Sequence, residues 1–180
     1  MPLKKKKQKK RAYLDDYKRN CDGTFSYTGS FMICAGDEKE YKKIKTSLLC
    51  ISAFILALQI LCGIIPTEGM LGCPYVILPY AFSFIVLVRI LWAAGKLYMS
   101  EYPVKEYVFS ATVVKVQNYS LVLTAFVATA TAGNMVFTAI NGWGRSISAS
   151  ICFIALEIIS AAGAAALKRI STSVKWEKTP

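Results

Sequence analysis

An acidic side chain lies deep in an apolar segment towards the C-terminus. Glu157 stands ten residues into the run Ile147–Leu167, whose other residues are apolar or small. A carboxylate at that depth of a membrane-length segment is costly, so Glu157 is the best candidate for a working site. On a functional interpretation it binds a proton or a cation. On a structural interpretation it is a paired or protonated residue that fixes helix packing.

Arg89 is the candidate counter-charge for Glu157, because it lies in another apolar run, Tyr75–Gly95. Counted from Lys96 and Lys168 at the inner ends of the two runs, Arg89 and Glu157 differ in depth by about 6 Å. An extended arginine can bridge that offset. Arg89 can instead snorkel to the inner headgroups on the helix face that it shares with Lys96. Of these two interpretations of Arg89, we favour snorkelling.

Few other residues could carry chemistry. The chain has no histidine, which removes Ser-His-Asp and Cys-His catalysis and His-ligated haem. Its six cysteines form no C-x-x-C pair, and neither a P-loop nor a G-x-G-x-x-G run is present. We therefore expect no enzyme, no cofactor and no metal site.

Four apolar runs must position these groups, and 54% of the 180 residues are hydrophobic. Each run is near the length of about 20 residues that crosses a bilayer. They are Ser47–Ile65, with Gln59 its only strongly polar side chain, Tyr75–Gly95, Ser120–Ile140 and Ile147–Leu167. The sequence predicts an all-α membrane protein with four transmembrane helices in the cell membrane.

Charge fixes the expected orientation of these helices. Residues 1–46 hold 13 basic and 6 acidic side chains, and the segments 96–119 and 168–180 are also basic. Pro66–Pro74 has no basic residue, and Arg145 is the only one in the last loop. Because basic loops stay on the inner side, both termini are predicted to be cytoplasmic.

The N-terminal tail begins with a block of basic residues that we expect to be disordered by self-repulsion. The block contains Lys4, Lys5, Lys6, Lys7, Lys9, Lys10 and Arg11. Either it contacts anionic lipid headgroups, at about 1 kcal/mol per charge, or it only fixes topology. Because a membrane helix follows this tail, anionic lipid is a nearer partner than nucleic acid.

The tail also predicts a small cytoplasmic β-hairpin around Gly29, because aromatic and β-branched residues flank that glycine. Two strands alone are marginally stable, so the hairpin must lean on another element. Val108–Val116 could supply a third strand or extend the third helix, and both remain open. Asp37 is predicted to cap the first helix, with Glu38 and Lys42 paired at i, i+4.

Small residues at four-residue spacing predict a packing seam on the third and fourth helices. They are Ala125, Thr129 and Gly133 on the third, with Ala161 and Ala165 on the fourth beside Glu157. Packing within the monomer is the first interpretation, and a homodimer contact is the alternative. Cys62 and Cys73 flank the short outer loop, and we do not expect them to be bridged.

The predicted organisation is a tail, a hairpin, four helices and their connections. The segments are a basic tail (1–19), hairpin (20–36), juxtamembrane and first helix (37–65), second helix (75–99), cytoplasmic loop (100–119), third helix (120–140), fourth helix (147–169) and cytoplasmic tail (170–180). The expected function is a non-enzymatic accessory subunit or scaffold that meets a partner protein through its cytoplasmic tail. The alternative is a small oligomeric transporter or channel component, with Glu157 as its coupling residue.

Overall fold

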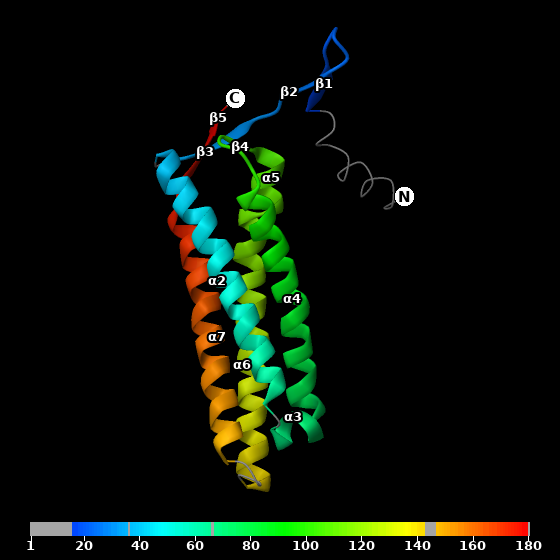
Figure 1. Ribbon diagram of the computed structural model, residues 1–180, viewed down its shortest axis with the longest axis vertical. Coiled ribbons are helices and arrows are strands. Elements are labelled where there is room, and N and C mark those ends of the chain that lie inside the picture. Colours follow the sequence, from blue (N-terminus) through cyan, green and yellow to red (C-terminus); the bar gives the residue numbers. More distant parts are fainter. Residues whose placement is uncertain (1–15, 36, 66, 143–146, 180) are drawn as a thin grey trace.

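Four long helices lie side by side in the computed structural model, which describes residues 16–35, 37–65, 67–142 and 147–179 (Figure 1). Short strands gather at one end of the helices, which we call the sheet end. The short helix α3 (Glu68–Gly72) lies at the opposite end, which we call the α3 end.

The four helices agree with the predicted spans in number and type. They are α2 (Glu38–Ile64), α4 (Pro74–Tyr98), α6 (Val113–Asn141) and α7 (Ile147–Ser173). All four are long and apolar enough to cross a membrane, which supports a membrane location. The third and fourth helices are longer than predicted, because the helices continue into the polar segments at the sheet end.

Each helix packs against two neighbours, in the cyclic order α2, α4, α6, α7. Successive helices run in opposite directions, as in an up-down-up-down bundle. The buried positions of α7 recur at alternating steps of three and four residues: Ser150, Phe153, Glu157, Ser160, Ala164, Leu167 and Ser171. This heptad spacing keeps one face of each helix towards its neighbours.

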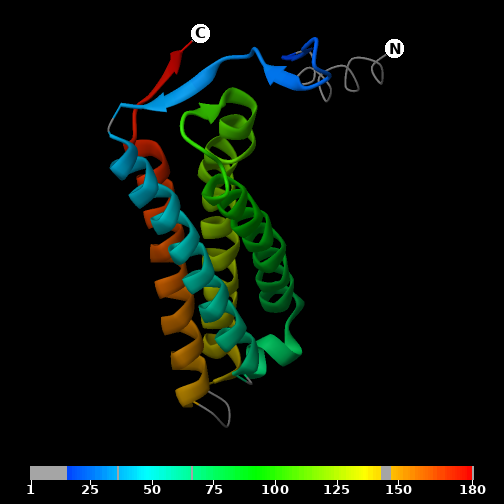
Figure 2. The same ribbon diagram turned by 45° about the horizontal axis from the view of Figure 1, so that its top comes forward.

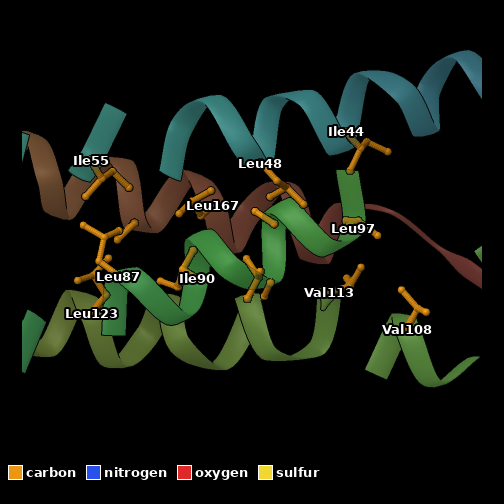
Figure 3. Packing of buried hydrophobic residues seen from close by; sticks show 14 of the residues in the cluster. Ile44, Leu48, Ile55, Leu87, Ile90, Leu97, Val108, Val113, Leu123 and Leu167 are labelled. Atoms are coloured by element: carbon orange, nitrogen blue, oxygen red, sulfur yellow. The ribbon is translucent and has the colours of Figure 1, made fainter. Parts of the chain in front are cut away.

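The apolar part of the core is densest in the half of the bundle nearer the sheet end. Leu48 of α2, Leu87 and Ile90 of α4, Leu123 of α6 and Leu167 of α7 are fully buried there. Their side chains meet between the four ribbons (Figure 3). Burial of each such side chain contributes about 1.5–3 kcal/mol where water is the reference solvent.

Five short strands form two small sheets at the sheet end. They are β1 (Tyr17–Arg19), β2 (Phe25–Tyr27), β3 (Phe31–Cys34), β4 (Val104–Lys105) and β5 (Trp176–Thr179). β1 pairs with β2, whereas β3 is the central strand between β4 and β5, and all these pairs are antiparallel. Figure 2 shows the β1–β2 hairpin extending sideways past the ends of the helices.

The predicted hairpin around Gly29 is wrong in its strands. The turn lies between Asn20 and Thr24, where Gly23 has a positive φ of 81°. Asp22 Oδ1 accepts hydrogen bonds from Thr24 N at 3.1 Å and from Thr24 Oγ1 at 2.6 Å. This local turn closes β1 on β2 and frees β3 to pair with segments far along the chain.

The two alternatives for residues 108–116 are decided in favour of helix. The segment forms most of α5 (Glu106–Ala111) and the beginning of α6, with a break at Thr112. The strands beside β3 come from β4 and β5 instead, and β5 lies in the segment predicted as a tail. At the start of α2, Asp37 takes the capping position without a side-chain capping bond, and the predicted Lys42–Glu38 pair forms at 2.8 Å.

The hairpin turn is expected to loosen in acid. The hydrogen bonds from Thr24 hold the pKa of the Asp22 carboxyl below its ordinary value. Because the pKa of Asp22 is depressed in the folded state, the ionised carboxylate stabilises the turn above the unfolded pKa of about 3.9. This stabilisation is lost as pH falls through the lower pKa of the folded state. The Thr24 amide resonance, followed by NMR, should shift over that range. In Asp22→Asn the acid-dependent shift should be absent, and its persistence would contradict this assignment.

Candidate functional site

Glu157 lies in the interior of the bundle, on the heptad face of α7. Its side chain is 1% exposed, so neither water nor lipid covers it. The sequence placed this residue correctly in a helix of membrane-spanning length, facing other helices. What surrounds the carboxylate differs from the prediction.

The partner of Glu157 is Gln59 of α2. Gln59 Nε2 donates a hydrogen bond to Glu157 Oε1 at 3.1 Å. Cys62, one turn further along α2, is buried as well. A neutral amide therefore faces this acid, in place of a cation.

The polar contacts continue from Gln59 to α4. Ser83 Oγ lies 3.0 Å from Gln59 Oε1 and 2.6 Å from the Tyr80 carbonyl oxygen, so both acceptors share its one proton. The Tyr80 hydroxyl donates a hydrogen bond to the main-chain carbonyl oxygen of Gln59 at 2.5 Å. The side chains of Ser83, Gln59 and Glu157 thus join α4, α2 and α7 through the core.

Some polar atoms near this depth stay unsatisfied. Among the described residues, Glu157 Oε2, Ser160 Oγ and both side-chain polar atoms of Asn134 are buried without a hydrogen-bond partner. Each such group carries a desolvation cost, and native proteins keep few of them. The free oxygen of Glu157 can accept a further donor, or hold a proton when the acid is neutral.

Arg89 is not a partner of Glu157. Its side chain is exposed on the outer surface of α4, between the buried positions Leu87 and Ile90. The two salt bridges in the described part of the chain join Glu38 to Lys42 and Glu106 to Lys178. The structure therefore separates the two residues that the sequence offered as one site, and the outward position agrees with the snorkelling alternative.

The predicted seam does not pack inside the bundle. Ala125, Thr129 and Ala165 are exposed and Ala161 is half-buried. Steps of four residues advance about 40° beyond a full turn each time, so such a stripe drifts off a face built on heptads. Gly133 is the exception, because a Cβ there would lie 3.0 Å from the Tyr75 carbonyl oxygen of α4.

The remaining sequence candidates have mixed outcomes. Lys4–Arg11 lie outside the described residues. Cys62 and Cys73 are free thiols, as expected. No group of three potential His, Cys, Asp or Glu ligands occurs within the described ranges.

An aromatic cluster joins the sheet end to the helices. Tyr41 of α2 is 1% exposed, and its ring centroid lies 5.4 Å from that of Tyr102 and 6.3 Å from that of Trp176 in β5. The Tyr41 hydroxyl lies 2.7 Å from Ser100 Oγ, just beyond α4. The sheet is thereby anchored on the bundle through β5.

A second cluster holds the hairpin. The Tyr17 hydroxyl lies 3.3 Å from the Tyr107 hydroxyl of α5, and this hydrogen bond is the main cause that lowers the pKa of Tyr17. The Lys105 ammonium lies 5.4 Å from the Tyr17 ring centroid and 5.3 Å from the Tyr27 ring centroid. These contacts join the hairpin to β4 and α5.

Sequence reasoning missed Gln59, Ser83 and Tyr80 as members of the buried site. The sequence feature that could have indicated this buried site was Gln59 itself, the only strongly polar side chain in the first apolar run. It stands four residues after Ile55, in phase with the buried positions of α2. No family model, curated protein or solved structure matches this chain.

Proposed function

We propose that this chain is a multipass protein of the cell membrane, with the sheet end and both termini in the cytoplasm. It acts as a non-enzymatic accessory subunit or scaffold. The orientation is supported by the distribution of basic residues, which are frequent before α2, between α4 and α6 and after α7. The absence of histidine and of nucleotide-binding motifs from the sequence supports a non-enzymatic role.

The observation that carries this proposal is the layer of strands at the sheet end. Segments before α2, between α4 and α5 and after α7 build the β4-β3-β5 sheet, and the hydrogen bond between the Tyr17 and Tyr107 hydroxyls joins the hairpin to α5. A transporter has no evident need for such a layer, whereas a subunit needs a shaped surface that is held in place. Phe25 in β2 is 68% exposed and gives this surface an apolar contact point.

The proposal can be tested by site-specific photocrosslinking in intact cells. A photoreactive residue at Phe25 is expected to yield one dominant crosslinked species. The matched control is Leu71 in α3, which is 80% exposed at the opposite end and should not yield that species. If Phe25 crosslinks only to lipid, or gives the same pattern as Leu71, the partner surface is not at the hairpin.

The second candidate function is that of a small oligomeric transporter or channel component with Glu157 as its proton- or cation-coupling residue. The buried Glu157 Oε2 without a partner favours it. Flux into proteoliposomes separates the two candidates. Ion- or pH-driven flux that is lost in Glu157→Gln and kept in Arg89→Gln would refute the scaffold. Absence of flux in folded wild-type protein would refute transport.

A further inference from the structure

A groove opens between the beginning of α2 and the end of α7, at the sheet end. It has a volume of about 560 Å³, within the range of about 300–1,000 Å³ that ligand pockets occupy. Its lining residues are Lys39, Glu40, Lys43, Ile44, Ser47, Ile170, Ser173 and Val174. The two helices that line it pack against each other.

The lining divides into a polar part and an apolar part. Lys39, Lys43 and Ser47 follow one another at four-residue steps, which places them along one side of α2. Ser173 adds a hydroxyl from α7. Ile44, which is 8% exposed, forms the apolar floor together with Ile170 and Val174.

The charge of the groove favours an anion. Lys39 and Lys43 bring two positive charges to its lining, against one negative charge from Glu40. No salt bridge in the described part of the chain engages Lys39, Lys43 or Glu40. Arg169 is exposed four residues before Ser173, on the same side of α7, and adds a further positive charge beside the groove.

The depth of the groove matches the boundary between headgroups and hydrocarbon. The apolar part of α2 begins at Leu48, just after Ser47, and that of α7 ends at Leu167. Lys43 lies about 6 Å and Lys39 about 12 Å of helix beyond Ser47. The lysines therefore stand at headgroup height. Ile44 and Ile170 lie about 6 Å and about 4.5 Å of helix outside Leu48 and Leu167, in the interfacial layer between headgroups and hydrocarbon.

We propose that this groove binds one anionic phospholipid of the cytoplasmic leaflet. The phosphate contacts Lys39 and Lys43, with the hydroxyl of Ser47 as a further donor. The glycerol part of the lipid lies along Ile44 and Ile170. Basic pockets between membrane helices on the cytoplasmic side are suited to such headgroups. The inference rests on the orientation given under the proposed function.

The test uses the full-length protein, purified in detergent and titrated with phosphatidylglycerol or phosphatidylcholine under native mass spectrometry. Wild type should bind phosphatidylglycerol in preference to phosphatidylcholine. The double variant Lys39→Gln/Lys43→Gln should weaken phosphatidylglycerol binding about 25-fold, or about fivefold for each lysine. Lys42→Gln/Lys115→Gln, which removes the same charge from exposed positions outside the groove, should stay within about twofold of wild type.

Two further experiments define the ligand. Ser173→Trp fills the groove without a change of charge and should also reduce phosphatidylglycerol binding. Millimolar inorganic phosphate should not displace the lipid, because it lacks the glycerol and acyl parts of the lipid. Displacement by phosphate would show an anion site without lipid specificity and would overturn the proposal.

Other outcomes would overturn the proposal as well. Equal losses in the two double variants would show an unspecific effect of surface charge. Equal binding of the two lipids by wild type would exclude the site. Extraction of the wild-type protein from membranes by alkaline carbonate would refute the membrane placement, whereas loss of lipid preference in a carbonate-resistant protein would refute the groove alone.

Discussion

Replacement of Tyr41 by alanine is expected to lower the free energy of unfolding by about 3 kcal/mol or more. The ring is 1% exposed and packs between Tyr102 and Trp176, so its removal leaves a cavity where α2 meets β5. The hydroxyl contact with Ser100 Oγ at 2.7 Å is lost as well. Because Tyr41 contacts both the end of α4 and the last strand, the strand layer should loosen together with the helix ends.

Two variants separate the ring from its hydroxyl and from general effects of tyrosine removal. Tyr41→Phe keeps the ring and should cost about 1 kcal/mol. Tyr98→Ala removes a tyrosine that is 46% exposed on α4 and should cost less than Tyr41→Ala. Unfolding in mixed micelles, monitored by tryptophan fluorescence, reports all three. A loss below about 1 kcal/mol for Tyr41→Ala would contradict the anchoring role of this side chain.

Replacement of Gln59 by leucine is the second change with a large expected effect, about 2 kcal/mol. It removes the donor to Glu157 Oε1, and Glu157 Oε2 already has no hydrogen-bond partner. Ser83 keeps the Tyr80 carbonyl oxygen as an acceptor, so the loss should come from Glu157. A buried acid without its partner is costly, whereas an apolar pair in the same place is tolerated.

A double-mutant cycle tests whether Gln59 and Glu157 are partners. Glu157→Leu alone should also destabilise, because it leaves the Gln59 amide without an acceptor. The variant Gln59→Leu/Glu157→Leu should regain much of the stability, with a coupling energy of about 1–2 kcal/mol. The control cycle pairs Arg89→Gln with Glu157→Leu and should be additive within about 0.5 kcal/mol. Additivity in the first cycle, or coupling in the second, would contradict the assigned partner.

The helices could be predicted from the sequence because lipid imposes a length on them. About 20 apolar residues without charge have few alternatives to a membrane helix. Their ends near the strands were harder to place, because α6 and α7 continue into polar sequence where hydropathy no longer indicates the boundary. Glu157 was found for the same reason as the helices, since a charge is conspicuous in such a segment.

The partner of Glu157 could not be derived from depth alone. Gln59 and Arg89 each differ from Glu157 by less than about 8 Å in depth along the bundle. What separates them is the helix face, because Gln59 is in phase with the buried residues of α2 and Arg89 is out of phase with those of α4. A heptad count on each helix would have favoured Gln59, whereas the steps of four residues used for the seam obscured that phase.

The sheet was beyond sequence reasoning for a different reason. β3 pairs with β4 and β5, and these strands have two and four residues. Such segments carry almost no periodicity, and their pairing depends on where the helices bring their ends. The local turn at Gly23 was also overlooked, because the aromatic residues around Gly29 suggested a hairpin of their own.

The position of β3 has a consequence for the order of biosynthesis. This strand leaves the ribosome before the first helix, and its partner β5 is translated after the fourth. If the helices cross a membrane as proposed, β3 keeps the edge that pairs with β5 open until the fourth helix has been inserted. On that placement, completion of the sheet marks the end of insertion, and a chain whose last helix fails to insert would expose that edge to quality-control proteases or chaperones.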